Sequence, residues 1–279
     1  MGTQVVDPTK MEWETASTHR TPGIETKPLL RRDGEGRSFE FNVVRFGGED
    51  FWSPRHRHNF DQIRIGLEGQ TNYGPHRALP ARTIGYYPEG TYYGPQSVTD
   101  VPSVQAIMQF DGASRGGYVS YEHLDKATAE LRELGEFRKG YWHPNDGGKA
   151  IDGYQASWER VTGRSMVYPE PRFAEAVYMH VDAFSWLPVA GSEVRQKHLG
   201  AFGERGLTIS MLQVPGGAQA TIGQPGGSTV GFVLSGGLNT GAGTQNLYSA
   251  LLIEEDELGT VTGSAESSEL IIVTLPTFD

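Results

Sequence analysis

Two histidines separated by one residue are the clearest candidates for chemistry in this chain. They are His56 and His58, in the segment Ser53-Pro54-Arg55-His56-Arg57-His58-Asn59-Phe60-Asp61-Gln62. Residues two apart in a strand point to the same face and lie about 6–7 Å apart, so both imidazoles can converge on one metal ion. Gln62 has the same parity and can join them if the strand bends. The alternative is that both histidines are hydrogen-bonded inside the domain without a metal.

An arginine on the same strand is the second candidate, for a catalytic role. Arg64 shares its parity with Gln62, so we expect both side chains to point into one interior. A buried arginine must be paired or must bind an anionic ligand. The alternative is a structural ion pair with Asp61 or Glu68. Aromatic and amide side chains nearby in the sequence can line a pocket for an organic substrate. The candidates are Trp52, Tyr73, Tyr86 and Gln96.

The histidine segment resembles the first sequence motif of the cupin superfamily. That motif reads Gly, five residues, His-x-His, three or four residues, Glu, six residues, Gly. His56, His58 and Gly69 match it, and Gln62 occupies the position of the Glu. This resemblance implies a β-barrel with the ligands His56 and His58 on one strand.

The stretch from Gly85 to Ser97 resembles the second cupin motif, which reads Gly, five residues, Pro-x-Gly, two residues, His, three residues, Asn. Pro88 and Gly90 match, although the spacing before Pro88 is shorter than in the motif. Tyr93 stands at the position of the metal-binding His, and Ser97 stands at that of the Asn. The second motif is therefore degenerate.

The cupin resemblance implies a metal site of three histidines and one glutamate that holds iron, manganese, nickel, copper or zinc. This chain keeps two of those histidines, and Gln62 replaces the carboxylate, so we expect weaker binding of a divalent metal. Three roles stay open for Tyr93. It can bind the metal as a phenolate, donate a proton as a general acid, or line the pocket.

The pattern of elements divides the chain into four parts. Residues 1–37 are predicted to be an irregular N-terminal arm. Alternating apolar residues bounded by Gly, Pro, Asn and Asp predict a barrel over 38–118 and a second barrel over 176–279. Residues 119–175 are predicted to be a connector with a helix near 122–135. The fold expected is all-β, with two cupin-type jelly-roll barrels as in the bicupins.

The second barrel is expected to be metal-free, because no histidine follows His198. We expect an architectural role for it, with a surface that can support a homodimer.

Composition excludes several classes of protein. The net charge of −10 argues against binding to nucleic acids or to anionic membranes. The absence of cysteine excludes disulfides, thiolate nucleophiles and iron–sulfur clusters. The N-terminal residues lack the apolar segment of a signal peptide, so we expect a cytoplasmic protein.

The resemblance favours a metal-dependent enzyme that acts on a small organic substrate. A dioxygenase-like oxidoreductase is therefore the first hypothesis. The second hypothesis is an isomerase or lyase, metal-independent or using a metal as Lewis acid, with Tyr93 as general acid. The third is a small-molecule-binding cupin without catalysis. The retained His56 and His58 favour the first hypothesis, and the missing His and Glu favour the other two.

Overall fold

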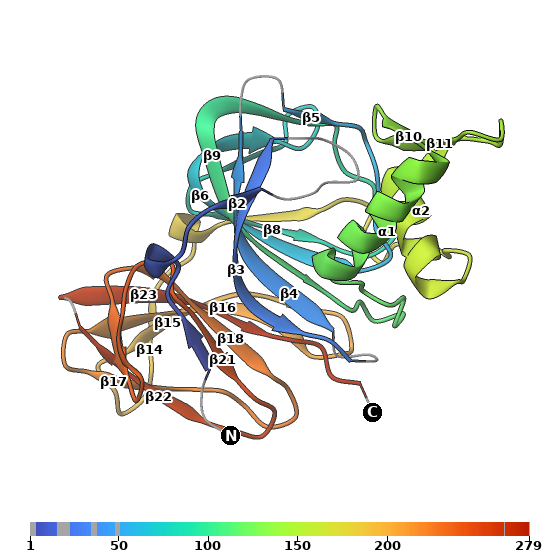
Figure 1. The fold of residues 1–279 in the computed structure, drawn as a ribbon. Coiled ribbons are helices and arrows are strands. Elements are labelled where there is room, and N and C mark those ends of the chain that lie inside the picture. The colour runs from blue at the N-terminus through green and yellow to red at the C-terminus, as the bar shows by residue number, and fades with distance from the viewer. Residues whose placement is uncertain (1–3, 16–22, 35–37, 48–50, 265, 279) are drawn as a thin grey trace. The chain divides into compact units, whose positions relative to one another are not determined.

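The structure, a computed structural model, describes residues 4–15, 23–34, 38–47, 51–264 and 266–278. Within these residues the chain is built mainly from strands, and its α-helices are confined to one region between residues 121 and 162 (Figure 1). The all-β class predicted from the sequence is confirmed.

The chain forms two compact units, which are both discontinuous in sequence. The N-terminal unit consists of residues 13–27 and 31–179, and the C-terminal unit consists of residues 1–12, 28–30 and 180–279. The region expected to be a separate connector therefore belongs to the N-terminal unit.

The N-terminal unit is built on one large sheet. Its strand order in the described residues is β13-β8-β6-β9-β4-β3-β2, with β5 beside β9 and β7 beside β6. The strands are β2 (Glu14–Thr15), β3 (Ile24–Arg32), β4 (Phe39–Phe46), β5 (Trp52–Ser53), β6 (Asp61–Asn72), β7 (Ala78–Pro80), β8 (Thr83–Tyr87), β9 (Gln96–Phe110) and β13 (Val177–His180).

Strand β6 separates apolar from polar side chains by simple alternation. Ile63 pairs with Met108 of β9, and both side chains are almost fully buried. Gln62 and Arg64 alternate with Ile63 and are buried as well. One face of β6 is thus apolar, whereas the opposite face carries polar groups into the interior.

A helical insert follows β9 and packs on this unit. It contains α1 (Tyr121–Leu134), α2 (Gly153–Thr162) and a small sheet of β10 (Gly135–Arg138), β11 (Tyr141–Pro144) and β12 (Ile151–Asp152). Asp152 caps α2, because its carboxylate accepts hydrogen bonds from the N–H groups of Tyr154 and Gln155. The predicted helix near 122–135 is confirmed as α1.

Buried aromatic side chains join the insert to the barrel. Phe60 and Tyr118 form one apolar cluster with Leu124, Tyr154 and Trp158. Glu40 of β4 also holds the start of α1: its carboxylate accepts hydrogen bonds from the Tyr118 hydroxyl and the Tyr121 N–H, both at 3.0 Å.

The C-terminal unit contains two sheets in its described part. The larger has the order β1-β21-β18-β23-β16-β15-β14, and the smaller has the order β17-β22-β19-β20. Their strands are β1 (Gln4–Val6), β14 (Leu187–Pro188), β15 (Arg195–Phe202), β16 (Leu207–Pro215), β17 (Gln219–Ile222), β18 (Thr229–Ser235), β19 (Leu238–Thr240), β20 (Gly243–Gln245), β21 (Ala250–Ile253), β22 (Gly259–Gly263) and β23 (Ser267–Thr274). Aliphatic side chains such as Val233, Leu251 and Leu270 form its core.

The described residues of the predicted arm form strands rather than irregular chain. β1 pairs with β21 in the C-terminal unit, and β2 pairs with β3 in the N-terminal unit. β1 and β2 are three and two residues long, too short to produce a visible hydrophobic period. β3 spans nine residues, but its sequence IETKPLLRR does not alternate apolar and polar side chains. Their backbone hydrogen bonds to neighbouring strands hold them in place.

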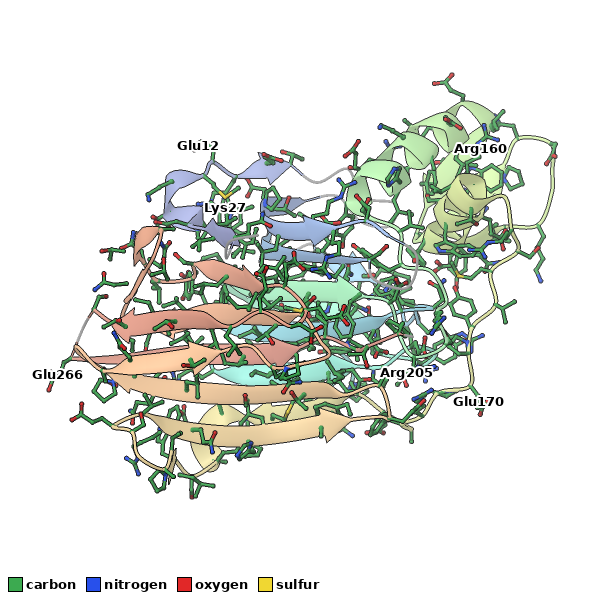
Figure 2. The ribbon with its side chains drawn as sticks, turned by 90° about the horizontal axis from the view of Figure 1, so that it is seen from below. Glu12, Lys27, Arg160, Glu170, Arg205 and Glu266 are labelled. Carbon is green, nitrogen blue, oxygen red and sulfur yellow. The ribbon has the colours of Figure 1, made fainter. Side chains whose placement is uncertain are left out.

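Charged side chains cover the outside. Glu12, Arg160, Glu170 and Glu266 are exposed and project away from the ribbon (Figure 2). None of the described helices is long and apolar enough to cross a membrane.

Candidate active site

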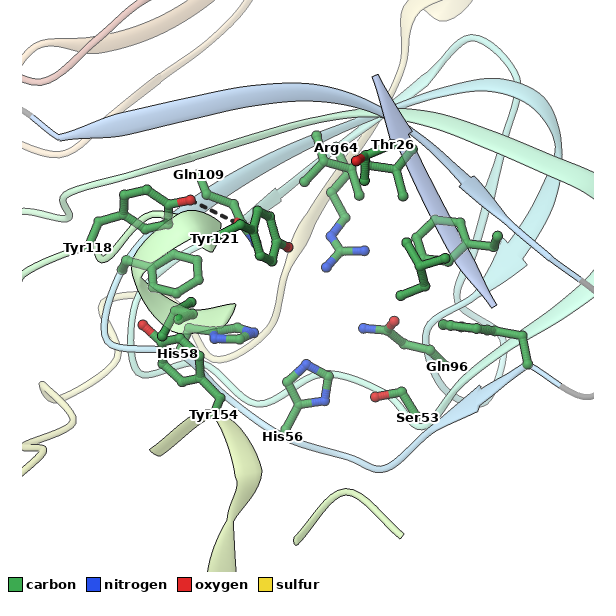
Figure 3. Close-up of a pocket in the computed structure, with 17 residues that line it drawn as sticks. Thr26, Ser53, His56, His58, Arg64, Gln96, Gln109, Tyr118, Tyr121 and Tyr154 are labelled. Carbon is green, nitrogen blue, oxygen red and sulfur yellow. Dashed lines mark hydrogen bonds between the residues drawn. The ribbon is translucent and has the colours of Figure 1, made fainter. Parts of the chain in front are cut away.

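A cavity of about 90 Å³ lies inside the N-terminal unit (Figure 3). Its polar wall comes from strand ends and the loop between β5 and β6. Its polar groups, apart from tyrosine hydroxyls, are Thr26, Ser53, His56, His58, Arg64, Gln96 and Gln109. Apolar side chains complete the wall, among them Val44, Phe46, Phe51, Ile107 and Leu124. A space of this size holds several water molecules or one small organic molecule.

The backbone around His56 fixes this residue at the cavity. His56 and Tyr93 exchange two backbone hydrogen bonds of 3.0 Å, which tie the histidine loop to the loop after β8. The Nδ1 atom of His56 lies 2.6 Å from the Pro54 carbonyl oxygen. Because a carbonyl oxygen can only accept, Nδ1 must carry a proton. In the neutral ring the lone pair is then on Nε2, on the edge that faces the cavity (Figure 3).

His58 lies beside His56 in the same wall. The two ring centroids are 5.1 Å apart and the planes are nearly perpendicular. Phe60 and Tyr154 hold the His58 ring, with centroid distances of 4.4 and 4.8 Å. Each histidine is only 6% exposed. The two imidazoles line one cavity, but the sequence prediction that they lie on one strand is wrong, because both belong to the loop between β5 (which ends at Ser53) and β6 (which begins at Asp61).

Arg64 enters the cavity from β6, with its guanidinium directed toward His56, His58 and Gln96 (Figure 3). Its side chain donates to the Tyr73 hydroxyl at 2.8 Å and to the Gln62 carbonyl oxygen at 3.0 Å. A longer contact of 3.4 Å reaches the Tyr93 hydroxyl. Arg64 is thus buried among neutral partners.

Gln62 is held by hydrogen bonds at both ends of its amide. Its carbonyl oxygen accepts from Arg64 and from Gln109 Nε2, the latter at 3.1 Å, and its own Nε2 donates to the Tyr93 hydroxyl at 2.9 Å. The side chain lies behind the cavity wall rather than in it. Tyr93 also lies behind the wall, with its ring 4.5 Å from that of His56.

These donors do not match the metal site that the cupin motifs imply. Among the described residues, no group of three or more His, Cys, Asp or Glu side chains is placed to hold a metal ion. The carbonyl oxygen of Gln62 already accepts two N–H donors, and the Arg64 cation faces the same cavity as the two histidines. Two neutral imidazoles beside a fixed positive charge make a poor site for a divalent cation.

The other predicted pocket residues are distributed differently. Gln96 lines the cavity as expected. Trp52 is 49% exposed, because alternation along the chain turns its neighbours Phe51 and Ser53 inward. Tyr73 is buried behind Arg64, and its hydroxyl donates to Gln105 at 2.7 Å. Tyr86 donates to Asp61 at 2.9 Å, away from the cavity.

The sequence prediction missed the contribution of the helical insert. Tyr118, Tyr121, Leu124 and Tyr154 all line the cavity, although they belong to the segment expected to be a connector or to its border. Leu124 was predictable as a buried residue of the helix from its spacing. Its contact with the site was not, since no motif links α1 to the histidine loop.

Burial keeps the tyrosines around the guanidinium neutral. Desolvation, followed by the negative charge of Glu40, raises the pKa of Tyr121 to about 12. Desolvation also raises the pKa of Tyr73, and the Arg64 charge and hydrogen bonds only partly offset it. At neutral pH these phenols are therefore hydrogen-bond partners of Arg64 rather than counter-ions.

Comparison with known proteins shows similarity at the level of structure. No family model matches the sequence, and no curated protein matches it. A protein from Nostoc punctiforme proposed to be a dioxygenase superposes with a TM-score of 0.65 at 12% identity, over 99% of this chain and 83% of that one. HEPD from Streptomyces albus, with 2-hydroxyethylphosphonate and Fe(II) bound, gives 0.58 at 10% identity, over 99% and 76%.

The third comparison is with the pirin YhhW from Escherichia coli in complex with nickel(II). It gives a TM-score of 0.51 at 8% identity, over 99% of this chain and all of that one. At these identities the likenesses show the fold alone, which the chain shares with these proteins over almost its whole length. The fold that the resemblance of His56, His58 and Gly69 implied is confirmed at that level.

Proposed function

We propose that the N-terminal unit is the active unit of an enzyme that transfers a proton on a small organic molecule, as an isomerase or lyase does. The observation that carries this proposal is the hydrogen bond between His56 Nδ1 and the Pro54 carbonyl. It orients Nε2 toward a cavity lined by Arg64 and Gln96.

The chemistry needs only groups that line the cavity. His56 Nε2 takes a proton from a carbon next to a carbonyl group, and the electron pair of the broken C–H bond moves to the carbonyl oxygen. N–H donors of Arg64 and Gln96 stabilise the negative charge that develops on this oxygen. Return of the proton to a neighbouring atom gives an isomer, and departure of a substituent gives a lyase product. His58 is near enough to supply or accept the second proton.

The test is solvent deuterium uptake followed by proton NMR in D₂O. Suitable probes are pyruvate, 2-oxobutyrate and hydroxyacetone, because each has exchangeable protons next to a carbonyl group. We expect wild-type protein to accelerate exchange on at least one probe. His56→Gln should lower that rate by about 10²–10⁴-fold.

The matched control is His198→Gln, which makes the same change at an exposed histidine of the C-terminal unit. It should exchange like wild type. The proposal would be contradicted if a bound probe exchanged its protons as fast with His56→Gln as with wild type. It would also be contradicted if probes bound to the wild-type protein but none of them exchanged.

The pair of histidines also supports a second candidate, metal-dependent oxidoreductase chemistry of the dioxygenase type. Both imidazoles face one cavity, and the descriptions of two structural neighbours name Fe(II) and nickel(II). Elemental analysis of protein purified without a metal-affinity tag distinguishes the candidates. A stoichiometric transition metal that both His56→Gln and His58→Gln lose would favour the second candidate over the first.

A further inference from the structure

We infer that the cavity binds its ligand through a carboxylate group, with Arg64 as the counter-ion. The inference rests on the proposed function, because the cavity is the proposed active site and the carboxylate defines the class of its substrate. Arg64 is 6% exposed, so its charge is almost completely removed from water.

No carboxylate among the described residues compensates this charge. The sequence offers Asp61 and Glu68 as local partners, but Asp61 accepts hydrogen bonds from the Glu89 N–H and the Tyr86 hydroxyl, and Glu68 is exposed. The nearest contacts of the guanidinium are two phenols and an amide. Leaving a charge buried without a counter-ion costs several kcal/mol, so a binding site is the natural reason to retain one.

The guanidinium also has hydrogen-bonding capacity to spare. It carries five N–H groups. Three hydrogen bonds to described residues use the two terminal nitrogens, and Nε is buried without a partner among those residues. A carboxylate in the cavity would supply both the missing charge and the missing acceptors.

The remaining wall restricts the rest of the ligand. Arg64 is the cation that lines the cavity in the described residues, and no lysine joins it there. One guanidinium matches one carboxylate better than a doubly charged phosphate. Phe46, Phe51 and Ile107 form an apolar side, and the volume of about 90 Å³ leaves room for only a short chain. The expected ligand is therefore a monocarboxylate of a few carbon atoms.

The test compares isosteric probes by ligand-observed NMR titration of the whole chain. Propanoate and butanoate carry the charge, and propanamide and butanamide do not. We expect wild type to bind the carboxylates at least about 10-fold more tightly than the amides. Arg64→Gln should weaken carboxylate binding by about 10- to 100-fold, because hydrogen bonds to charged groups contribute about 1.5–3 kcal/mol.

Controls separate this inference from the proposed function. Arg138→Gln changes an exposed arginine and should bind the carboxylates like wild type. Carboxylate preference is measured by binding to wild type and Arg64→Gln, whereas proton transfer is measured by deuterium exchange with wild type and His56→Gln, so either idea can fail alone. Equal affinity of wild type for carboxylate and amide would overturn the inference without any variant. Unchanged carboxylate affinity in folded Arg64→Gln would overturn it as well.

Discussion

At the residue scale, the pocket is defined by a polar network that surrounds one positive charge. Gln62 connects Arg64, Gln109 and Tyr93 through three hydrogen bonds. In the cupin motif the position of Gln62 holds a glutamate, whose negative charge would offset part of the charge of a metal ion or pair with an adjacent guanidinium. The neutral amide leaves the charge of Arg64 available to a ligand.

Gln62→Glu tests this role directly. The introduced carboxylate should form an ion pair with Arg64, and the Tyr93 hydroxyl can rotate to donate to it. We expect the free energy of unfolding to rise by about 1–3 kcal/mol and the affinity for propanoate to fall at least about 10-fold. Urea denaturation and NMR titration measure the two effects.

The same variant distinguishes a metal site from an anion site. If Gln62 belonged to a divalent-metal site, the added carboxylate would tighten metal binding. The affinity for propanoate would then stay the same. Gln219→Glu is the control, since it makes the same substitution at an exposed position of β17. Stronger propanoate binding in Gln62→Glu would disprove the role assigned to the neutral amide.

At the element scale, helix α1 contributes part of the cavity wall through Tyr121 and Leu124. Its first residues are held by Glu40 of β4, and Leu124 on its buried face reaches the cavity wall. The helix therefore determines how much room the ligand has beyond Arg64.

Leu124→Ala should enlarge the cavity and change its preference for chain length. Leu124 is 2% exposed, so its truncation removes buried contacts and should lower the free energy of unfolding by about 2–5 kcal/mol. We expect the preferred carboxylate to become longer by one or two methylene groups in a titration series from acetate to hexanoate.

The control lies on the same helix. Leu134 is 52% exposed, so Leu134→Ala should change neither stability nor preference appreciably. An unchanged chain-length preference in Leu124→Ala would show that α1 does not limit the ligand.

The sequence predicted many strands of the two barrels and helix α1, because their patterns are local, but it missed those of the N-terminal arm. The alternation of Gln62 and Arg64 with Ile63 is visible in the chain, and so is the apolar spacing that includes Leu124. The tyrosines of the insert could not be assigned to the site, because they lie about sixty to one hundred residues from the histidine loop along the chain. Trp52 was misplaced since a two-residue strand gives too little pattern to fix its parity.

At the scale of the whole molecule, both units are discontinuous along the chain, and the C-terminal unit includes the first residues of the chain. The C-terminal unit uses residues 1–12, and β1 pairs along Ala250, Leu251 and Leu252 of β21. Asn246 also donates a hydrogen bond of 2.9 Å to Asp7. A boundary drawn near residue 176 would therefore remove an edge strand from the second barrel.

This arrangement makes a fragment of residues 180–279 incomplete. Without β1, strand β21 becomes an exposed edge with fully apolar side chains, which favours aggregation and lowers stability. A peptide of residues 1–12 added in trans should raise the thermal midpoint of the fragment in a concentration-dependent way, because it binds only the folded form. A peptide carrying Val5→Asp should fail to do so, since Val5 packs against the aliphatic core. An identical midpoint with and without the wild-type peptide would mean that β1 does not stabilise this barrel. The contacts that assign residues 1–12 to the C-terminal unit would then contribute nothing to its stability.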